Sequence, residues 1–199
     1  SFLNSLTSLA AKDSNVVLLT ADLGFGVFEE FEQKFPGQYF NVGVAEQNMT
    51  GVAVGLSLEG KRVVTYSIAN FPILRCLEQI RNDACYHDAN IMIVGSGGGF
   101  SYGALGMSHH ATEDLAILRS LPSMSVVAPS SDWEAQEATK QLIKNGGVSY
   151  LRLDKTIYKN DIFDRQFQIG KSRIHNEGNH ITFISTGGIM HDVMMACKD

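Results

Sequence analysis

The sequence has few cysteines, and their placement excludes two common ways of stabilising a small protein. Its 199 residues include three, Cys76, Cys85 and Cys197, and none of them has CxxC spacing. An odd number of widely spaced cysteines argues against a disulfide framework or a zinc site, and it is typical of reduced thiols in a cytoplasmic protein. For Cys76, which lies in an apolar helical stretch, we expect a small buried hydrophobe in preference to a nucleophile.

Long apolar runs and surplus positive charge are lacking as well. The apolar runs span a few residues each, against ~18 for a membrane span. The sequence opens at Ser1 in an amphipathic pattern, so we expect no signal peptide. Lys and Arg number 16 against 21 Asp and Glu, which gives a net charge of −5. We therefore expect neither nucleic acid nor membrane among its partners.

What is present is an alternation of short β-rich runs with segments of helical period. The β-rich runs are almost continuously apolar, which is typical of parallel strands covered on both faces. We expect strands at residues 16–20, 39–42, 62–66, 91–94, 125–128 and 148–151, and helices at 45–58, 72–86, 112–120 and 132–144. This order predicts an α/β fold, a doubly wound and mostly parallel sheet with helices on both faces. Ligands would bind beyond the carboxyl ends of its strands.

The character of the chain changes near residue 160. A polar stretch there predicts a linker over residues 159–169, after a first domain of residues 1–158. A second apolar run at 181–185, followed by Thr186-Gly187-Gly188, predicts a strand–turn–helix unit. Residues 170–199 would then be the truncated start of a second domain, too short for a core of its own.

Two segments carry the residues best suited to chemistry. Residues 41–50 (NVGVAEQNMT) place one carboxylate, Glu46, at a strand-to-helix junction among apolar neighbours. Such a glutamate is either a buried acid or merely a solvated partner of the helix dipole, and spacing alone leaves both readings open. Residues 95–110 form a long glycine-rich loop that ends in His109 and His110 and lacks the P-loop pattern. Those histidines match no metal motif, and two surface loop histidines remain the alternative.

Several motifs resemble the pyrimidine-binding domain of transketolase-like, thiamine-diphosphate-dependent enzymes. They are residues 41–49, LEQIR at 77–81, GMSH at 106–109 and LR at 151–152. The resemblance covers roughly residues 1–155, and residues 170–187 resemble the opening of the family's C-terminal domain. It implies the thiamine-diphosphate pyrimidine-binding fold, and it favours the catalytic reading of Glu46.

The resemblance also implies that this chain supplies half of a site. The family builds its active site between two domains, and the other domain holds the diphosphate and a divalent ion through a GDG…N motif. No GDG occurs in these 199 residues. The implied cofactors are thiamine diphosphate and Mg²⁺ or a similar ion, with the ion held by a diphosphate-binding N-terminal transketolase subunit. We expect no metal ligand in this chain, and we expect a dimer or another homo- or hetero-oligomer.

Glu46 matches the family glutamate that hydrogen-bonds N1′ of the aminopyrimidine. A proton shared with N1′ favours the 4′-imino tautomer, which removes the proton from C2 of the thiazolium. Val44, Ala45 and Met49 would supply the dry surroundings of this carboxylate.

The resemblance assigns further roles around the cofactor and the substrate. His109 matches a loop histidine that lies close to reacting substrate oxygens, and Arg152 matches an arginine that binds substrate phosphate, which suits a guanidinium fork. The resemblance also implies a second substrate contact for His110, a loop approaching the cofactor for Asp22, and an aromatic beside the aminopyrimidine for Phe71, with Tyr66 as second choice.

The implied function is that of a transketolase-like subunit, transferring a two-carbon ketol unit between sugar phosphates. Two departures leave the substrate open: Leu105 replaces a family aspartate, and residues 97–99 replace a phosphate-contacting histidine. Alternatives are a deoxyxylulose-phosphate synthase-like enzyme, a 2-oxoacid dehydrogenase β-chain-like enzyme, and a non-catalytic dimerisation module. Intact Glu46 and His109 favour an enzyme over the last of these.

Overall fold

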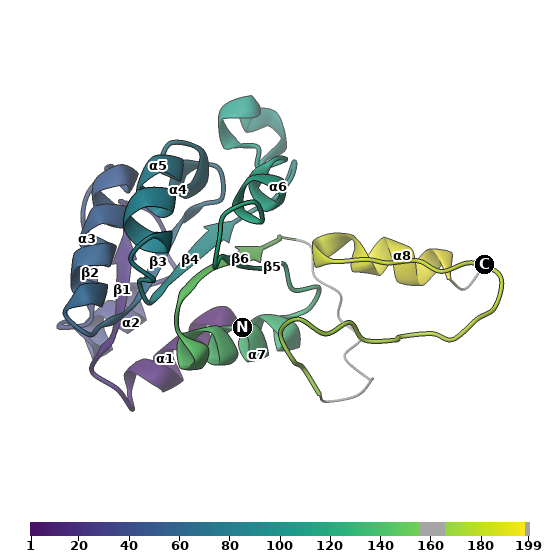
Figure 1. Cartoon of the computed structure of the whole chain (residues 1–199), viewed down its shortest axis with the longest axis horizontal. Helices are drawn as coiled ribbons and strands as arrows, with labels where there is room; N and C mark the ends of the chain where they lie inside the picture. Colours follow the sequence, from purple (N-terminus) through teal and green to yellow (C-terminus); the bar gives the residue numbers. More distant parts are fainter. Residues whose placement is uncertain (156–165, 198–199) are drawn as a thin grey trace.

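The computed structural model describes residues 1–155 and 166–197, and a parallel sheet forms its centre (Figure 1). The six strands have the order β2-β1-β3-β4-β6-β5, and each is parallel to its neighbours. They are β1 (Val16–Thr20), β2 (Tyr39–Asn41), β3 (Arg62–Ile68), β4 (Ile91–Ser96), β5 (Ser125–Val127) and β6 (Val148–Leu153). All six predicted strands, and the predicted fold class, are confirmed.

Helices cover both faces of this sheet, as a doubly wound fold requires. One face carries α1 (Phe2–Ala10), α2 (Glu29–Lys34) and α7 (Asp132–Asn145), and in Figure 1 α1 lies beside α7. The other face carries α3 (Glu46–Leu58), α4 (Phe71–Leu74), α5 (Leu77–Gln79), a π-helical turn (Ile80–Cys85) and α6 (Asp114–Leu118). The helices predicted from the sequence include neither α1 nor α2. None of the helices described has the length and apolar character that a bilayer crossing requires.

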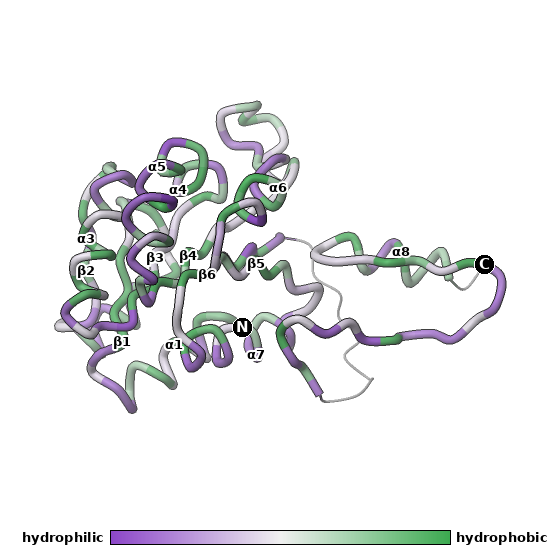
Figure 2. Tube along the Cα trace, viewed as in Figure 1, coloured by the Kyte–Doolittle hydropathy of each residue, from purple (hydrophilic) through white to green (hydrophobic). Residues whose placement is uncertain are grey.

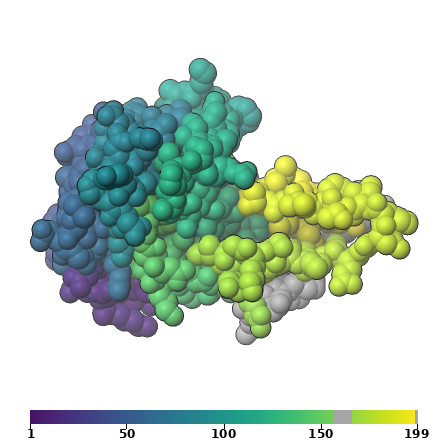
Figure 3. Space-filling model, viewed as in Figure 1, coloured from purple at the N-terminus to yellow at the C-terminus, as the bar shows by residue number. Residues whose placement is uncertain are grey.

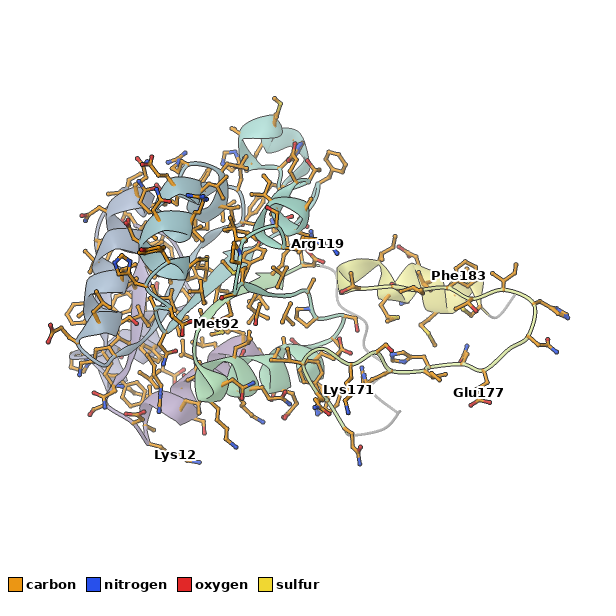
Figure 4. The ribbon with its side chains drawn as sticks, in the orientation of Figure 1. Lys12, Met92, Arg119, Lys171, Glu177 and Phe183 are labelled. Atoms are coloured by element: carbon orange, nitrogen blue, oxygen red, sulfur yellow. The ribbon has the colours of Figure 1, made fainter. Side chains whose placement is uncertain are left out.

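Strand β1 shows how one apolar run serves two layers of core. Val17 and Leu19 pack toward α3, whereas Val16 and Leu18 pack toward α1 and α7, and none of the four is more than 2% exposed. Successive side chains of a strand point to opposite faces, so a strand covered twice has no solvated position left for a polar residue. Figure 2 shows the hydrophobic residues along these central strands, and Met92, labelled in Figure 4, lies among them.

The single helix predicted over residues 72–86 is wrong in detail. It is broken into α4, α5 and the π-helical turn, in which the amide of Tyr86 donates to the carbonyl of Arg81 at 3.2 Å. Across these three pieces Ile73, Cys76 and Ile80 all face the core, where they are fully buried. Burial raises the pKa of the Cys76 thiol to about 11, so its expected role as a small buried hydrophobe is confirmed.

The strand predicted over residues 181–185 is also wrong. Ile181 and Ile184 are 75% and 94% exposed, and no strand follows β6 within residues 1–155 and 166–197. A strand forms only where a neighbouring strand takes up its backbone groups, and the described chain offers this segment none. A 3₁₀ turn (Gly187–Ile189) and α8 (Met190–Ala196) do follow. They lie on an arm, residues 166–197, whose yellow end projects from the rest of the molecule in Figure 3.

The described end of the predicted linker and the residues that follow it attach to one helix, α7. Residues 159–165 of the linker lie outside the described residues, so the division at 158 and 170 stays a prediction. Gln141 of α7 donates to the carbonyl of Phe167 at 2.7 Å and accepts from the amide of Ile169 at 3.2 Å. Further along the arm, Arg173 pairs with Glu134 of the same helix.

Tyr150 of β6 offers a test of the buried polar bonds in this fold. Its fully buried hydroxyl donates to Oδ2 of Asp114 at 2.7 Å. Burial, and then the charge of Asp114, raises the pKa of Tyr150 well above its ordinary value, so the hydroxyl remains a donor. We expect Tyr150→Phe to lower the free energy of unfolding by about 1–3 kcal/mol in urea denaturation, because it takes a partner from a buried carboxylate.

Tyr39→Phe is the matched control for this measurement. The Tyr39 hydroxyl is partly buried and shares a neutral hydrogen bond of 3.1 Å with Thr20, so its loss should be smaller. Equal losses in the two variants would show that the carboxylate bond of Tyr150 adds nothing.

Candidate functional site

The predicted site residues gather along the edge formed by the carboxyl ends of the strands. The chain passes from β1 to β2 on one side and then to β3 on the other, so the loops leaving β1 and β3 part in opposite directions. A reversal of this kind opens a crevice where ligands bind in doubly wound folds. Asp22 follows β1, Glu46 follows β2, Phe71 follows β3 and His109 follows β4.

Glu46 begins α3, and its side chain is 3% exposed. Its Oε2 accepts a hydrogen bond of 2.9 Å from Nη1 of Arg75, which approaches from the end of α4. Met49, one helical turn on, is fully buried, but Val44 is 75% exposed. The expectation that Val44 encloses the carboxylate is therefore wrong, because the residue lies in the loop before the helix begins.

Phe71 connects the carboxylate to the glycine-rich loop. The guanidinium carbon of Arg75 lies 4.9 Å from the centroid of the Phe71 ring, and the His109 ring meets the same phenyl ring nearly edge-on at 5.1 Å between centroids. Glu46, Phe71 and His109 were predicted from separate motifs, and the fold brings them to one place.

Arg75, Phe71 and His109 form a row of contacting groups, and Tyr102 and Lys155 extend this row beyond His109. The Tyr102 ring lies 5.9 Å from the ring of His109, and Nζ of Lys155 stands 3.7 Å from the Tyr102 centroid, a cation–π contact. Burial raises the pKa of Tyr102 above its ordinary value. Sequence reasoning missed Arg75, Tyr102 and Lys155. The one signal available was that Lys155 lies three residues beyond Arg152, at the end of the same strand.

The loop that carries the histidines is closed at its base and tied at its tip. Gly99 and Ala111 exchange backbone hydrogen bonds of 2.7 and 3.0 Å, which form an antiparallel bridge. Asn70, just before α4, donates through Nδ2 to the carbonyls of Met107 and Ser108 at 3.2 and 2.8 Å. The loop is thus fastened to the end of β3, which holds its histidines near α4.

The two histidines have different surroundings. Nδ1 of His109 lies 3.0 Å from the hydroxyl of Ser108. Nε2 of His110 donates to the carbonyl of Gly103 at 2.9 Å, and its ring packs against Phe100, so this side chain serves the loop itself. The structure therefore brings His109 to the row at Phe71, whereas it does not show His110 in contact with the other predicted site residues.

The glycines of this loop make room for side chains. A Cβ on Gly97, whose φ is +79°, would lie 2.4 Å from the Tyr102 ring, and a Cβ on Gly98 would lie 2.3 Å from Nε of Arg152. Any larger residue would displace Tyr102 or Arg152. The glycine run thus has a packing reason in this fold.

Arg152 lies in a network of buried charges. Its side chain is 15% exposed; Nη1 donates to Asp114 at 3.2 Å, and Nε lies 3.4 Å from Asp154. Oδ2 of Asp154 also accepts the amide of Gly188 at 2.7 Å, which attaches the arm to the sheet. Two carboxylates flank this guanidinium, and its binding of substrate phosphate stays a prediction.

Asp22 and Tyr66 lie to the β1 side of the row. Asp22 has a left-handed backbone (φ +55°), and its side chain and amide form hydrogen bonds of 3.1 and 2.9 Å with the Asn41 side chain. The Tyr66 ring packs edge-on against Phe28 at 4.7 Å, in the core layer opposite to that of Met49. Phe71, and not Tyr66, is therefore the aromatic that contacts Arg75. A recess in the surface lies elsewhere, along residues 166–175 of the arm.

Comparison with known proteins agrees with the motifs. The family described as "Transketolase, pyrimidine binding domain" matches residues 1–160. An apulose-4-phosphate transketolase subunit of Phocaeicola vulgatus is 33% identical over 98% of this chain and 64% of its own length. A putative transketolase C-terminal section of Methanocaldococcus jannaschii is 36% identical over 96% of this chain and 62% of its own length.

A solved structure agrees in three dimensions. A protein described as a split gene transketolase, inactive beta4 tetramer, superposes with a TM-score of 0.88 at 32% identity, over 99% of this chain and 64% of that one. The chain thus spans a little less than two thirds of the length of these three relatives. With residues 1–160 matched and the fold shared, the chain belongs to the transketolase pyrimidine-binding domain family.

Proposed function

We propose that this chain provides the aminopyrimidine half of a thiamine-diphosphate site in a transketolase-like enzyme. The enzyme would transfer a two-carbon ketol unit between sugar phosphates. One observation carries the proposal: Glu46, 3% exposed, begins α3 and pairs with Arg75, which lies over the Phe71 ring, at the edge where ligands bind in this fold. A glutamate that merely complements a helix dipole would be solvated at this position.

The donor set at this edge fits an aminopyrimidine. Glu46 accepts an N–H from the guanidinium of Arg75, and that flat group also contacts the Phe71 ring. A flat ring with a polar edge can use the same two contacts, one with the carboxylate and one with the phenyl face. The bound cofactor would supply a thiazolium carbon that attacks the ketose carbonyl.

Glu46 and His109 would handle the protons. Low exposure strengthens a hydrogen bond from Glu46 to the pyrimidine nitrogen and lets the two groups share a proton. Ser108 orients His109 through Nδ1 at 3.0 Å, so we assign Nε2 to proton exchange with substrate oxygens. Asp22, with its carboxylate fixed by Asn41, would border the cofactor on the β1 side.

A partner chain is part of this proposal. Large apolar side chains are exposed on the loops beyond β1, β2 and β4, namely Phe25, Val44, Phe100, Leu105 and Met107. Exposed apolar groups around a polar site are typical of a surface that another protein covers. We propose a diphosphate-binding transketolase subunit as that partner, with Mg²⁺ or a similar ion held on its side. We place the complex in the cytoplasm, in keeping with the three free cysteines.

The substrate phosphate would bind at the end of β6. Arg152 and Lys155 both carry positive charge there, but Arg152 is flanked by Asp114 and Asp154, whereas Lys155 is exposed over Tyr102. We propose that the two cations bind the phosphate together, with Arg152 as the inner one and Lys155 as the outer one.

Glu46→Gln tests the catalytic assignment. The variant keeps the size of the side chain and one hydrogen bond, but it cannot share a proton with the pyrimidine. In a complex with the diphosphate-binding partner, we expect C2-proton exchange of bound thiamine diphosphate, followed by NMR, to slow by about 10²–10⁴-fold. Glu137→Gln, at an α7 carboxylate paired with Lys140, is the control. Unchanged exchange in Glu46→Gln would leave the dimerisation module as the better reading.

The isolated chain tests the need for a partner. Because GDG is missing from these 199 residues, the diphosphate end of the cofactor would find no metal ligands. We expect calorimetry to detect only weak binding of thiamine diphosphate and Mg²⁺ by this chain, and assays to detect no turnover. Micromolar binding together with turnover by the chain alone would contradict the half-site.

Lys155→Met and Arg152→Lys test the phosphate contact. Losing one charged hydrogen bond costs about 1.5–3 kcal/mol, so each variant should raise KM for phosphorylated sugars and change KM little for unphosphorylated ones. Lys140→Met, which removes a surface ion pair on α7, is the control. Equal changes for both kinds of sugar would count against phosphate binding at the end of β6.

A further inference from the structure

Arg75 stands directly between two groups to which the proposed function assigns the cofactor. Its Nη1 donates to Oε2 of Glu46 at 2.9 Å, and its guanidinium carbon lies 4.9 Å from the Phe71 centroid. The carboxylate of this pair is 3% exposed, but the arginine side chain is 51% exposed. The pair thus joins a buried carboxylate to a cation that reaches it from the solvent side.

This asymmetry distinguishes Arg75 from Arg152, the other arginine at this edge. Arg152 is 15% exposed and is flanked by two carboxylates, which are themselves at most 9% exposed, so both sides of that contact are enclosed. Arg75 has water on one side, and an arginine side chain can extend into solvent while its stem stays packed. Its guanidinium can therefore leave Glu46 without opening the core.

The guanidinium of Arg75 also has the shape of the expected ligand. It is planar, it donates N–H groups along its edge, and it stacks on aromatic faces. An aminopyrimidine ring in this site needs the same carboxylate and the same phenyl face. Two flat groups cannot both lie on that face of Phe71 and bind the same Oε2 of Glu46, so a ring that enters there has to displace the guanidinium.

We propose that Arg75 is an internal placeholder, which occupies the aminopyrimidine position in the cofactor-free chain and is displaced when the ring enters. This inference rests on the proposed function and adds a positioning residue to it. A buried carboxylate without a partner is strongly destabilising, and Arg75 prevents that state while the site is empty of ligand. Binding then has to break the pair, so affinity is reduced by the fraction of molecules in which Arg75 still covers Glu46.

The test measures binding to the full chain, with thiamine as the probe. NMR titration at millimolar concentration gives Kd and also follows the Nε–H signal of Arg75. In the wild-type chain, we expect thiamine to shift this signal toward that of a free arginine. We expect Arg75→Met to bind thiamine about 5–30-fold more tightly, the range for a charge-assisted hydrogen bond that is partly screened by solvent. Arg75→Lys, which keeps the charge but not the flat face, should lie between wild type and Arg75→Met.

Arg81→Met is the matched control, because Arg81 is an exposed arginine of the π-helical turn whose Nη1 donates to the Asn82 side chain. It should bind thiamine like the wild-type chain. If Arg75→Met and Arg75→Lys bind no more tightly than wild type while wild type does bind, the placeholder is wrong and the proposed function stands. If neither the wild-type chain nor any folded variant binds thiamine, the proposed function fails and the placeholder fails with it.

Discussion

The common direction of the six strands is the constraint on which the rest of this structure depends. Parallel strands need a crossing segment between them, and those segments cover both faces of the sheet with helices. Neither face is then open to a ligand, whereas every loop that leaves a carboxyl end opens at the same edge. Glu46, Phe71, His109 and Lys155 follow four different strands, and the direction of the sheet brings them together.

The local sequence pattern predicted secondary structure correctly wherever a segment determines its own conformation. Strands β1 and β4 follow from their apolar runs, because a run with almost no polar position has to be covered on both faces. Pattern failed where the outcome depends on a distant neighbour. Residues 181–185 have a strand-like sequence but form no strand, because no adjoining strand is present among the described residues. The predicted 72–86 helix is divided into two short helices and a π-helical turn, with its apolar side on the sheet. Val44 looked apolar enough to be buried, but it precedes the helix and faces solvent.

The same distinction separates the site residues that motifs found from those they missed. Glu46 and His109 lie in motifs, so a resemblance could assign them. Arg75 pairs with a carboxylate 29 positions away in sequence, and Lys155 contacts a tyrosine of the glycine-rich loop. Such pairs are products of the tertiary fold. The glycines were a partial signal, because Gly97 and Gly98 leave space that Tyr102 and Arg152 occupy. The sequence alone does not show which side chains fill that space.

The charges at this edge divide into a fixed set and an exchangeable pair. Asp114 and Asp154 share Arg152, and the Tyr150 hydroxyl and the Gly188 amide add further donors, so those carboxylates are held from several sides. Glu46 instead meets a cation that is half in water. A site that takes up a ligand needs rigid surroundings, so that geometry is preserved, together with one contact that can be replaced. The buried network provides the first at the end of β6, and the pairing of Glu46 with Arg75 provides the second at the start of α3.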